Sequence, residues 1–235
     1  MKFKVAGEFF EVLGNACFGV VAAYGLDNGR NISEISELLA KSISEAEAAF
    51  DNVNIKEAEA IAPYREAFRA LGLNPNKFMC SIEALLGRIA KKKGLPGINP
   101  AVDLGNAVSV KYRIPLGAHD LGSMAGDMEI RPARAGDTFV PFGGGESETP
   151  EPGEMIYVCG QEVRTRRWTW RQSELGKITS ATSAIFFPLD GFSGVNEAAL
   201  LAARDELAQR VRNIWGCRVV TGFVDKASPE FELGE

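Results

Sequence analysis

The sequence is poor in histidine and has no paired cysteines, and each shortage excludes a class of site. His119 is the single histidine among 235 residues, so a metal site built from several histidines is excluded, and a Ser-His-Asp mechanism would have to use this residue. The four cysteines lie far apart and form no Cys-x-x-Cys pair, which argues against a structural zinc site and against disulfides. We therefore expect buried, unpaired cysteines, no metal and no cofactor.

Long apolar runs are also absent. No run approaches the roughly 18–20 residues that a membrane-spanning helix needs. Glu8 and Glu11 interrupt the apolar residues near the start, which is not the pattern of a signal peptide. We expect a cytoplasmic protein with no membrane partner, folded as a single domain over residues 1–235.

Positive charge is scarce overall but locally concentrated. The net charge of −5 disfavours broad, nonspecific binding to nucleic acid, and we expect no DNA partner. Two basic clusters stand out: Arg88 with residues 91–93, and Arg164, Arg166, Arg167 and Arg171 around Trp168 and Trp170. A local basic surface on an acidic protein is compatible with binding one particular RNA.

The hydrophobic spacing predicts an α+β chain. Helices are expected over residues 33–43, 54–70 with an interruption at Pro63, 81–92, a stretch beginning at Asn99-Pro100, and 195–215. Strands are expected within 5–24, as short segments between 116 and 187, and over 217–224, followed by a loose polar tail after Lys226. The pattern indicates a helical N-terminal half packed on a strongly curved, strand-rich mixed β-sheet core, closed by a C-terminal helix and strand.

Three ordered blocks carry a family resemblance. Residues 99–110 read NPAVDLGNAVSV, residues 115–120 read PLGAHD, and residues 173–179 read SELGKIT. They resemble the paired third and fourth domains of the bacterial phenylalanyl-tRNA synthetase beta subunit, where an Asn-Pro-x-Val-Asp-x-x-Asn helix leads to a Pro-Leu-His-Ala-Phe-Asp turn and strand, and a Gly-Gly-Glu-x-x-x-Val-Thr run follows. The resemblance extends over about residues 63–215, with residues 1–62 as an extension of the same domain.

The resemblance implies a trans-editing aminoacyl-tRNA deacylase, a hydrolase that maintains translation fidelity. Its partners would be the aminoacylated acceptor end of a tRNA and the amino acid, free or esterified to that tRNA. One substrate class is an arginine mimic such as canavanine on arginine tRNA. An aminoacyl ester is already activated, so its hydrolysis needs a positioned water, oxyanion stabilisation and a selective pocket.

Glu174 and His119 are the catalytic candidates. Glu174 aligns with the glutamate of the family's editing site, where it could orient water or bind the substrate's ammonium group; the alternative is a solvated surface residue. The family has phenylalanine where this chain has His119 and histidine where it has Gly117. Because residues two apart in a strand share a face, His119 could still reach the same pocket; otherwise it is a hydrogen-bonded structural residue.

Candidate substrate-binding residues lie on the same blocks. Gly117 makes room for a different or longer substrate side chain. Asp103 and Asn106 are three apart on one helix face, where they could hold a substrate amine or brace the helix against a strand. Asp120 could recognise a cationic group or stabilise its turn.

Candidate RNA-binding residues come from the two basic clusters. Strand alternation would place Arg164, Arg166, Trp168 and Trp170 on one face, and Arg167 on the other, which suits phosphate contacts and base stacking. A cation–π ladder on a sheet is the competing interpretation. Lys91 and Lys92 could contact the acceptor stem or simply face solvent.

Two other functions remain open. The chain could be a non-catalytic module that binds tRNA or an amino acid, which the missing family histidine and the acidic charge favour. It could also be a small-molecule hydrolase or sensor that no longer binds RNA. A mobile loop is expected over residues 143–152, where glycines are followed by acidic residues.

Overall fold

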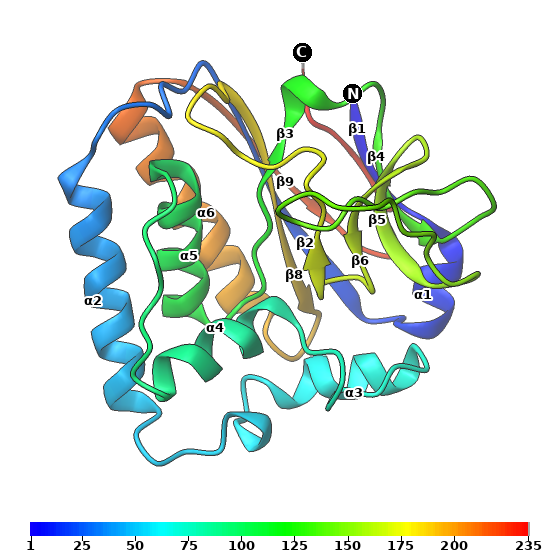
Figure 1. The fold of residues 1–235 in the computed structure, drawn as a ribbon, viewed down its shortest axis with the longest axis horizontal. Helices are drawn as coiled ribbons and strands as arrows, with labels where there is room; N and C mark the ends of the chain where they lie inside the picture. The colour runs from blue at the N-terminus through cyan, green and yellow to red at the C-terminus, as the bar shows by residue number, and fades with distance from the viewer. Residues whose placement is uncertain (235) are drawn as a thin grey trace.

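The computed structural model describes residues 1–234 and has two β-sheets with helices packed beside them (Figure 1). One sheet has the strand order β10-β1-β4-β5-β6-β7, and the other has the order β3-β8-β2-β9. The predicted α+β class is confirmed. The strands of the predicted strand-rich core divide between these two sheets.

The strands are β1 (Lys2–Val5), β2 (Ala16–Tyr24), β3 (His119–Asp120), β4 (Met128–Pro132), β5 (Met155–Cys159), β6 (Glu162–Arg166), β7 (Arg171–Gln172), β8 (Ala184–Phe192), β9 (Arg218–Val224) and β10 (Glu230–Glu232). The helices are α1 (Gly7–Val12), α2 (Ser33–Ala49), α3 (Ala62–Ala70), α4 (Ser81–Ala90), α5 (Pro100–Tyr112) and α6 (Glu197–Trp215), with 3-10 turns at Ile55–Glu57 and Leu121–Ser123. No helix within residues 1–234 combines the length and apolar character needed to cross a membrane.

The four-stranded sheet is covered on both faces. Its strands pair antiparallel, and α6, α5 and α2 lie in succession on one side of it (Figure 1). Alternate residues of β2 belong to different cores: Val20 and Ala22 pack with the six-stranded sheet, while Val21 and Ala23 pack with the helices. This is why β2 is a nearly continuous apolar run rather than an alternating one.

The six-stranded sheet is mixed. Its strand β1 lies between β4, with which it is parallel, and β10, with which it is antiparallel. The remaining pairs, β4 with β5, β5 with β6 and β6 with β7, are antiparallel.

Helix α5 begins where the sequence predicts. Asn99 caps it, since its Oδ1 accepts a hydrogen bond from the backbone N–H of Val102 at 3.1 Å, and Pro100 occupies the first turn. The side chain of Asn99 also donates to the carbonyl of Ile178 at 3.2 Å. This bond ties the start of the helix to the segment 173–179, so two of the sequence blocks are joined directly.

Two segments differ from expectation. Residues 7–12 form helix α1 and not part of a strand, because Phe9 and Phe10 turn inward together while Glu8 and Glu11 face solvent. The tail after Lys226 is not loose: β10 pairs with β1, with Phe231 opposite Phe3. The helix expected over 54–70 is divided as predicted at Pro63, which lies in the first turn of α3.

Candidate functional site

The segment 115–120 runs antiparallel along β8 at the edge of the four-stranded sheet. The backbone N–H of Gly117 donates to the carbonyl of Pro188 at 2.9 Å, and His119 pairs with Phe186. From the other side, the side chain of Gln172 donates to the carbonyl of Ala118 at 2.6 Å. The resembling blocks therefore converge on this edge.

A small cavity of about 80 Å³ opens beside this segment. Its walls include His119 from β3, Asp190 from β8, Tyr157 from β5 and Thr169 from the turn after β6. We call it the His119 cavity. It is the candidate active site, because ionisable and hydroxyl groups from four separate segments meet in it.

Asp190 is the buried carboxylate of the cavity, and only 2% of it is exposed. Its Oδ1 accepts two hydrogen bonds of 2.6 Å, from the hydroxyl of Tyr157 and from the indole N–H of Trp168. Burial raises the pKa of Asp190 from 3.8 to about 7, although these two donors act in the opposite direction. The carboxyl group therefore exchanges a proton near neutral pH.

His119 is held as a neutral imidazole. Burial, reinforced by the positive charge of Arg164, lowers the pKa of His119 from 6.5 to about 3. Its ring stacks on that of Tyr157 with centroids 5.9 Å apart. Its Nδ1 is buried and has no hydrogen-bond partner among the described residues.

Thr169 supplies a second unpartnered polar atom. Its hydroxyl is buried and bonds to nothing within the described part of the chain. A buried polar atom without a partner costs about 1–3 kcal/mol, and such atoms in native proteins call for a water or a ligand. Two of them in the walls of one cavity indicate that the His119 cavity accepts a polar guest.

Gly117 keeps the cavity open. A Cβ at this position would lie 3.2 Å from Cγ of Pro188 and 3.3 Å from Nε2 of His119. Even an alanine would press on the imidazole.

A second pocket of about 130 Å³ adjoins the first. Asn106 from α5, Phe142 and Lys177 line it, and Leu116 and Gln172 line both pockets. We call it the Asn106 pocket. Phe142 is 57% exposed, so an apolar side chain covers part of its mouth.

Glu174 lies beside the Asn106 pocket. Its Oε2 accepts a hydrogen bond from the backbone N–H of Gly143 at 2.9 Å, and its Oε1 pairs with Lys177. The bond to Lys177, followed by the one to Gly143, lowers the pKa of Glu174 below 4.5. The carboxylate is thus ionised and ties the glycine-rich loop to the segment 173–179.

Asp120 and Asp103, the two aspartates predicted to bind substrate, both accept hydrogen bonds from other residues of the chain. Asp120 accepts from the backbone N–H of Gly122 and from the hydroxyl of Thr182, both at 2.8 Å. Asp103 accepts from the backbone N–H of Ile98 at 2.9 Å, and burial raises its pKa. Asp103 and Asn106 line different pockets, in spite of their helical spacing.

The expected alternation from Arg164 to Trp170 is wrong. Strand β6 ends at Arg166, and the next two residues, Arg167 and Trp168, have positive φ angles of 48° and 59°. This left-handed turn rotates Trp168 into the core, where it is fully buried.

Most arginines of this cluster form hydrogen bonds or ion pairs with other residues of the same chain. Arg164 is 1% exposed and donates to the carbonyl of Ser123, and Arg166 is buried and paired with Glu154. In this conformation neither of these arginines, nor Trp168, offers a surface to RNA. Arg167 stacks on the ring of Phe78 at 4.1 Å. Lys91 and Lys92 are exposed at the end of α4.

Sequence reasoning missed Asp190, Tyr157 and Thr169. A signal for Asp190 was present: it is a lone carboxylate within the apolar strand 184–192, where an uncompensated charge is costly. Tyr157 and Thr169 carry no local signal, because their role depends on strands brought together by the fold. Within residues 1–234, no group of three or more His, Cys, Asp and Glu residues could hold a metal ion.

Comparisons with known proteins place the chain in a domain family and agree with its fold. The sequence model of the B3/4 domain matches residues 63–214. Among solved structures, an N-terminal fragment of the phenylalanyl-tRNA synthetase beta subunit from Pyrococcus horikoshii superposes with a TM-score of 0.51 at 9% identity. The similarity covers 92% of this chain and 49% of that fragment, so the chain spans about half of it, and at this identity the likeness concerns the fold. No curated protein matches the chain.

Proposed function

The chain belongs to the B3/4 domain family, and from that premise we propose that it is an aminoacyl-tRNA editing protein that hydrolyses the ester of a mischarged tRNA. The observation that carries the proposal is the His119 cavity. It combines a carboxyl group whose pKa lies near 7 with two buried polar atoms that lack partners.

Asp190 would serve as the general base. A catalytic base is most effective when its pKa lies near the working pH, and burial has moved this carboxyl group into that range. It would take a proton from a water molecule that attacks the ester carbonyl carbon. The bond between that carbon and the ribose oxygen then breaks, the ribose oxygen takes up a proton, and the amino acid leaves with the oxygen of the water.

His119 and Thr169 would position the reacting groups. A neutral imidazole and a hydroxyl can each hold a water or a carbonyl oxygen without a net charge. Nδ1 of His119 and the hydroxyl of Thr169 have no partner among the described residues, so they would bind a water or carbonyl oxygen without losing an existing hydrogen bond. His119 is thus proposed as an orienting group and not as the acid or base, since its pKa is about 3.

The Asn106 pocket would take the side chain of the wrong amino acid. Asn106 supplies polar contact there. A cationic side chain such as that of an arginine mimic would have to displace Lys177, which lines the pocket, from its ion pair with Glu174. The space left by Gly117 would connect the two pockets. On the tRNA side, exposed cations such as Lys91 and Lys92 would meet phosphates of the acceptor end.

A deacylation panel tests the proposal. Transfer RNAs charged with cognate and near-cognate amino acids are mixed with the wild-type protein, Asp190→Asn and Glu174→Ala. Asp205→Asn is the control, since it alters an exposed carboxylate on α6. We expect selective release of one mischarged amino acid, at least tenfold slower in Asp190→Asn and unchanged in the control.

A non-catalytic tRNA-binding module is the second candidate. It is favoured by the small size of the His119 cavity, about 80 Å³, and by the engagement of Glu174 with Lys177. If no ester in the panel is cleaved faster than in buffer while tRNA still binds in a salt-dependent way, this second function replaces the first.

A further inference from the structure

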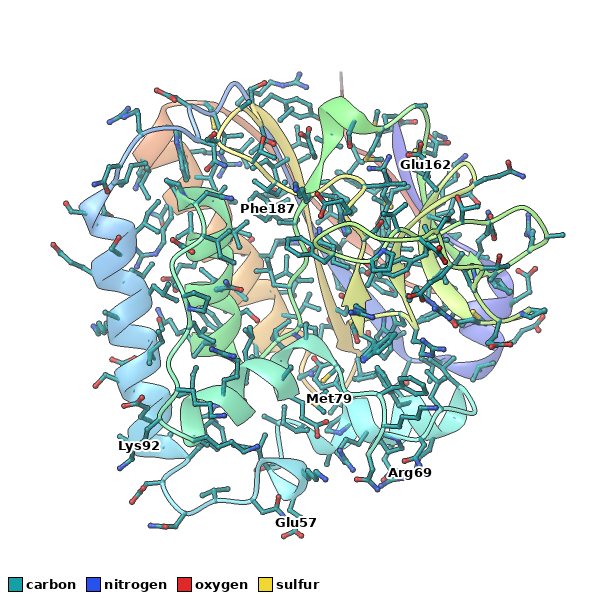
Figure 2. All side chains as sticks on the ribbon, in the orientation of Figure 1. Glu57, Arg69, Met79, Lys92, Glu162 and Phe187 are labelled. Carbon is teal, nitrogen blue, oxygen red and sulfur yellow. The ribbon has the colours of Figure 1, made fainter. Side chains whose placement is uncertain are left out.

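A separate, open cavity of about 560 Å³ lies between α4 and the segment 50–56. We call it the α4 cavity. It shares no lining residue with the His119 cavity or the Asn106 pocket. Figure 2 labels two of its lining residues, Met79 and Lys92, in the lower part of the molecule.

Glu83 gives this cavity an unused hydrogen-bond acceptor. The residue is 4% exposed, and its Oε1 accepts a 2.6 Å bond from Arg65. Its Oε2 is buried and has no hydrogen-bond partner among the described residues. A buried carboxylate oxygen needs donors, so the unfilled position accepts a hydrogen bond from a water or from a donor group of a ligand.

Gly87 leaves the middle of the cavity bare. It lies in the interior of α4, where glycine is less favourable than alanine, and a Cβ there would meet no atom within 4 Å. Helix packing therefore does not require glycine at this position. Its effect is a partly exposed backbone position without a side chain, against which a flat ring can lie.

Lys91 completes a stripe along one face of the helix. Glu83, Gly87 and Lys91 are spaced four residues apart, so they follow one another on the same side of α4. Lys56 and Lys92 add two more exposed cations to the cavity lining. The cavity thus has the Glu83 carboxylate at one end and Lys91 and Lys92 at the other. Its lining also includes Lys56, whose charge acts on Glu83, and the exposed carboxylate of Asp51.

We propose that the α4 cavity binds a phosphorylated nucleoside. An exocyclic amino group of the base would donate to Oε2 of Glu83, the base would lie over Gly87, and the phosphate would meet Lys91 and Lys92. Carboxylates commonly accept from such amino groups. Uracil lacks one and presents carbonyl oxygens that a carboxylate repels.

The spacing favours a nucleotide over an amino acid. Lys91, the residue that caps the C-terminus of α4, follows Glu83 by eight positions, which is about 12 Å along the axis. The α-ammonium and carboxylate groups of a free amino acid lie on one carbon and cannot reach both ends, whereas a nucleotide carries its amino group and its phosphate at opposite ends. Arginine, whose guanidinium group is separated from its carboxylate, is the competing ligand. The inference goes beyond the proposed editing function, because it requires no ester hydrolysis.

Calorimetric titration of the whole protein with adenosine, cytidine and uridine monophosphates is the test. We expect saturable binding of the adenosine and cytidine compounds, and binding of the uridine compound at least tenfold weaker. Gly87→Leu fills the cavity without meeting another atom at its Cβ, so it should abolish binding while the melting temperature is maintained. Lys91→Glu should weaken binding at least fivefold, and Lys93→Glu, the same charge change outside the lining, should not.

Titration with a trinucleotide containing cytidine distinguishes an RNA ligand from a free nucleotide. Tighter binding of the trinucleotide than of the monophosphate assigns the cavity to RNA, and equal binding assigns it to a free nucleotide. The proposal is overturned if uridine monophosphate binds as well as the others, if folded Gly87→Leu binds like wild type, if arginine binds in place of the nucleotides, or if neither the monophosphates nor the trinucleotide bind. Deacylation activity can fail without affecting any of these results.

Discussion

The rings of His119 and Tyr157 stack with their centroids 5.9 Å apart and their planes at 23°. The hydroxyl of the same tyrosine donates to Asp190 at 2.6 Å. One aromatic side chain therefore contacts both ionisable groups of the His119 cavity, whose pKa values move in opposite directions: the pKa of the carboxyl rises to about 7 and that of the imidazole falls to about 3. Such divergence is characteristic of acid–base sites.

Asp190→Asn should change how stability depends on pH. The folded protein keeps the Asp190 proton up to about pH 7, whereas the unfolded chain releases it near pH 4, so this group lowers stability as pH rises through that window. His119 acts in the opposite sense between about pH 3 and 6.5, since the unfolded chain binds the proton more tightly there. Asparagine retains an Oδ1 for Tyr157 and Trp168 and removes only the first effect.

We therefore expect the melting temperature of Asp190→Asn, relative to wild type, to increase from pH 4 to pH 7 and to level off above pH 8. Thermal denaturation across this range measures the difference directly. A difference that does not vary with pH would show that the pKa of Asp190 is not raised in the folded protein.

Thr169→Val should separate stability from activity. Valine has nearly the same shape, and the lost hydroxyl has no partner among the described residues, so the free energy of unfolding should stay within about 1 kcal/mol of wild type or rise. Deacylation should fall at least tenfold, because the group that holds the water or the ester oxygen is gone. Thr221→Val, on β9 outside the cavity, is the control. Unchanged activity in a stable Thr169→Val protein would remove Thr169 from the site.

Gly117→Ala should reduce activity more than stability. The added methyl group meets Pro188 and His119 at 3.2 and 3.3 Å, a crowding that costs about 1 kcal/mol in the free energy of unfolding. It also displaces the imidazole, so kcat/KM for the edited ester should fall at least tenfold. In Gly126→Ala the new methyl group meets no atom within 4 Å, and both quantities should remain near wild type. Equal activity in the two variants would contradict the positioning role of His119.

Gly176→Ala should destabilise the fold. Gly176 has a φ of 76°, and a Cβ there would collide with the guanidinium group of the buried Arg164. Gly72 has nearly the same φ of 74°, but a Cβ would meet nothing within 4 Å. We expect Gly72→Ala to cost about 1 kcal/mol, from backbone strain alone, and Gly176→Ala about 3 kcal/mol. Chemical denaturation of both variants gives the comparison, and equal losses would show that Arg164 moves aside without cost.

The elements with clear periodicity could be predicted from the sequence. Helix α5, with Asn99 and Pro100 at its start, and strand β9 lie where their patterns indicate. Helix α1 could not be predicted, since six residues with two adjacent phenylalanines fit no single period. The inward turn of Trp168 was equally hidden, because positive φ angles at two successive large residues depend on tertiary contacts such as the bond to Asp190.

The sequence blocks that carry the candidate residues lie together in the structure, but they do not contain every residue of the His119 cavity. The blocks containing His119, Gly117 and Glu174 do converge, because the segment 115–120 lies along β8 and bonds to residues around 172–176. Asp190, the general base of the proposed function, lies outside those blocks. Its unusual pKa comes from complete burial, and burial is a property of the assembled sheets and not of the local sequence.

The strand order also determines when the cavity can form as the chain is synthesised. Strand β1 pairs with β10, and β2 lies between β8 and β9, so the first strands made are completed by the last. Lys2 lies opposite Glu232, across almost the whole chain. Pairing over such separations requires closing a very large loop, which slows folding. Asp190 of β8 and Tyr157 of β5 belong to different sheets, so they meet only after both sheets have formed, and until then β2 exposes an apolar strand that favours aggregation.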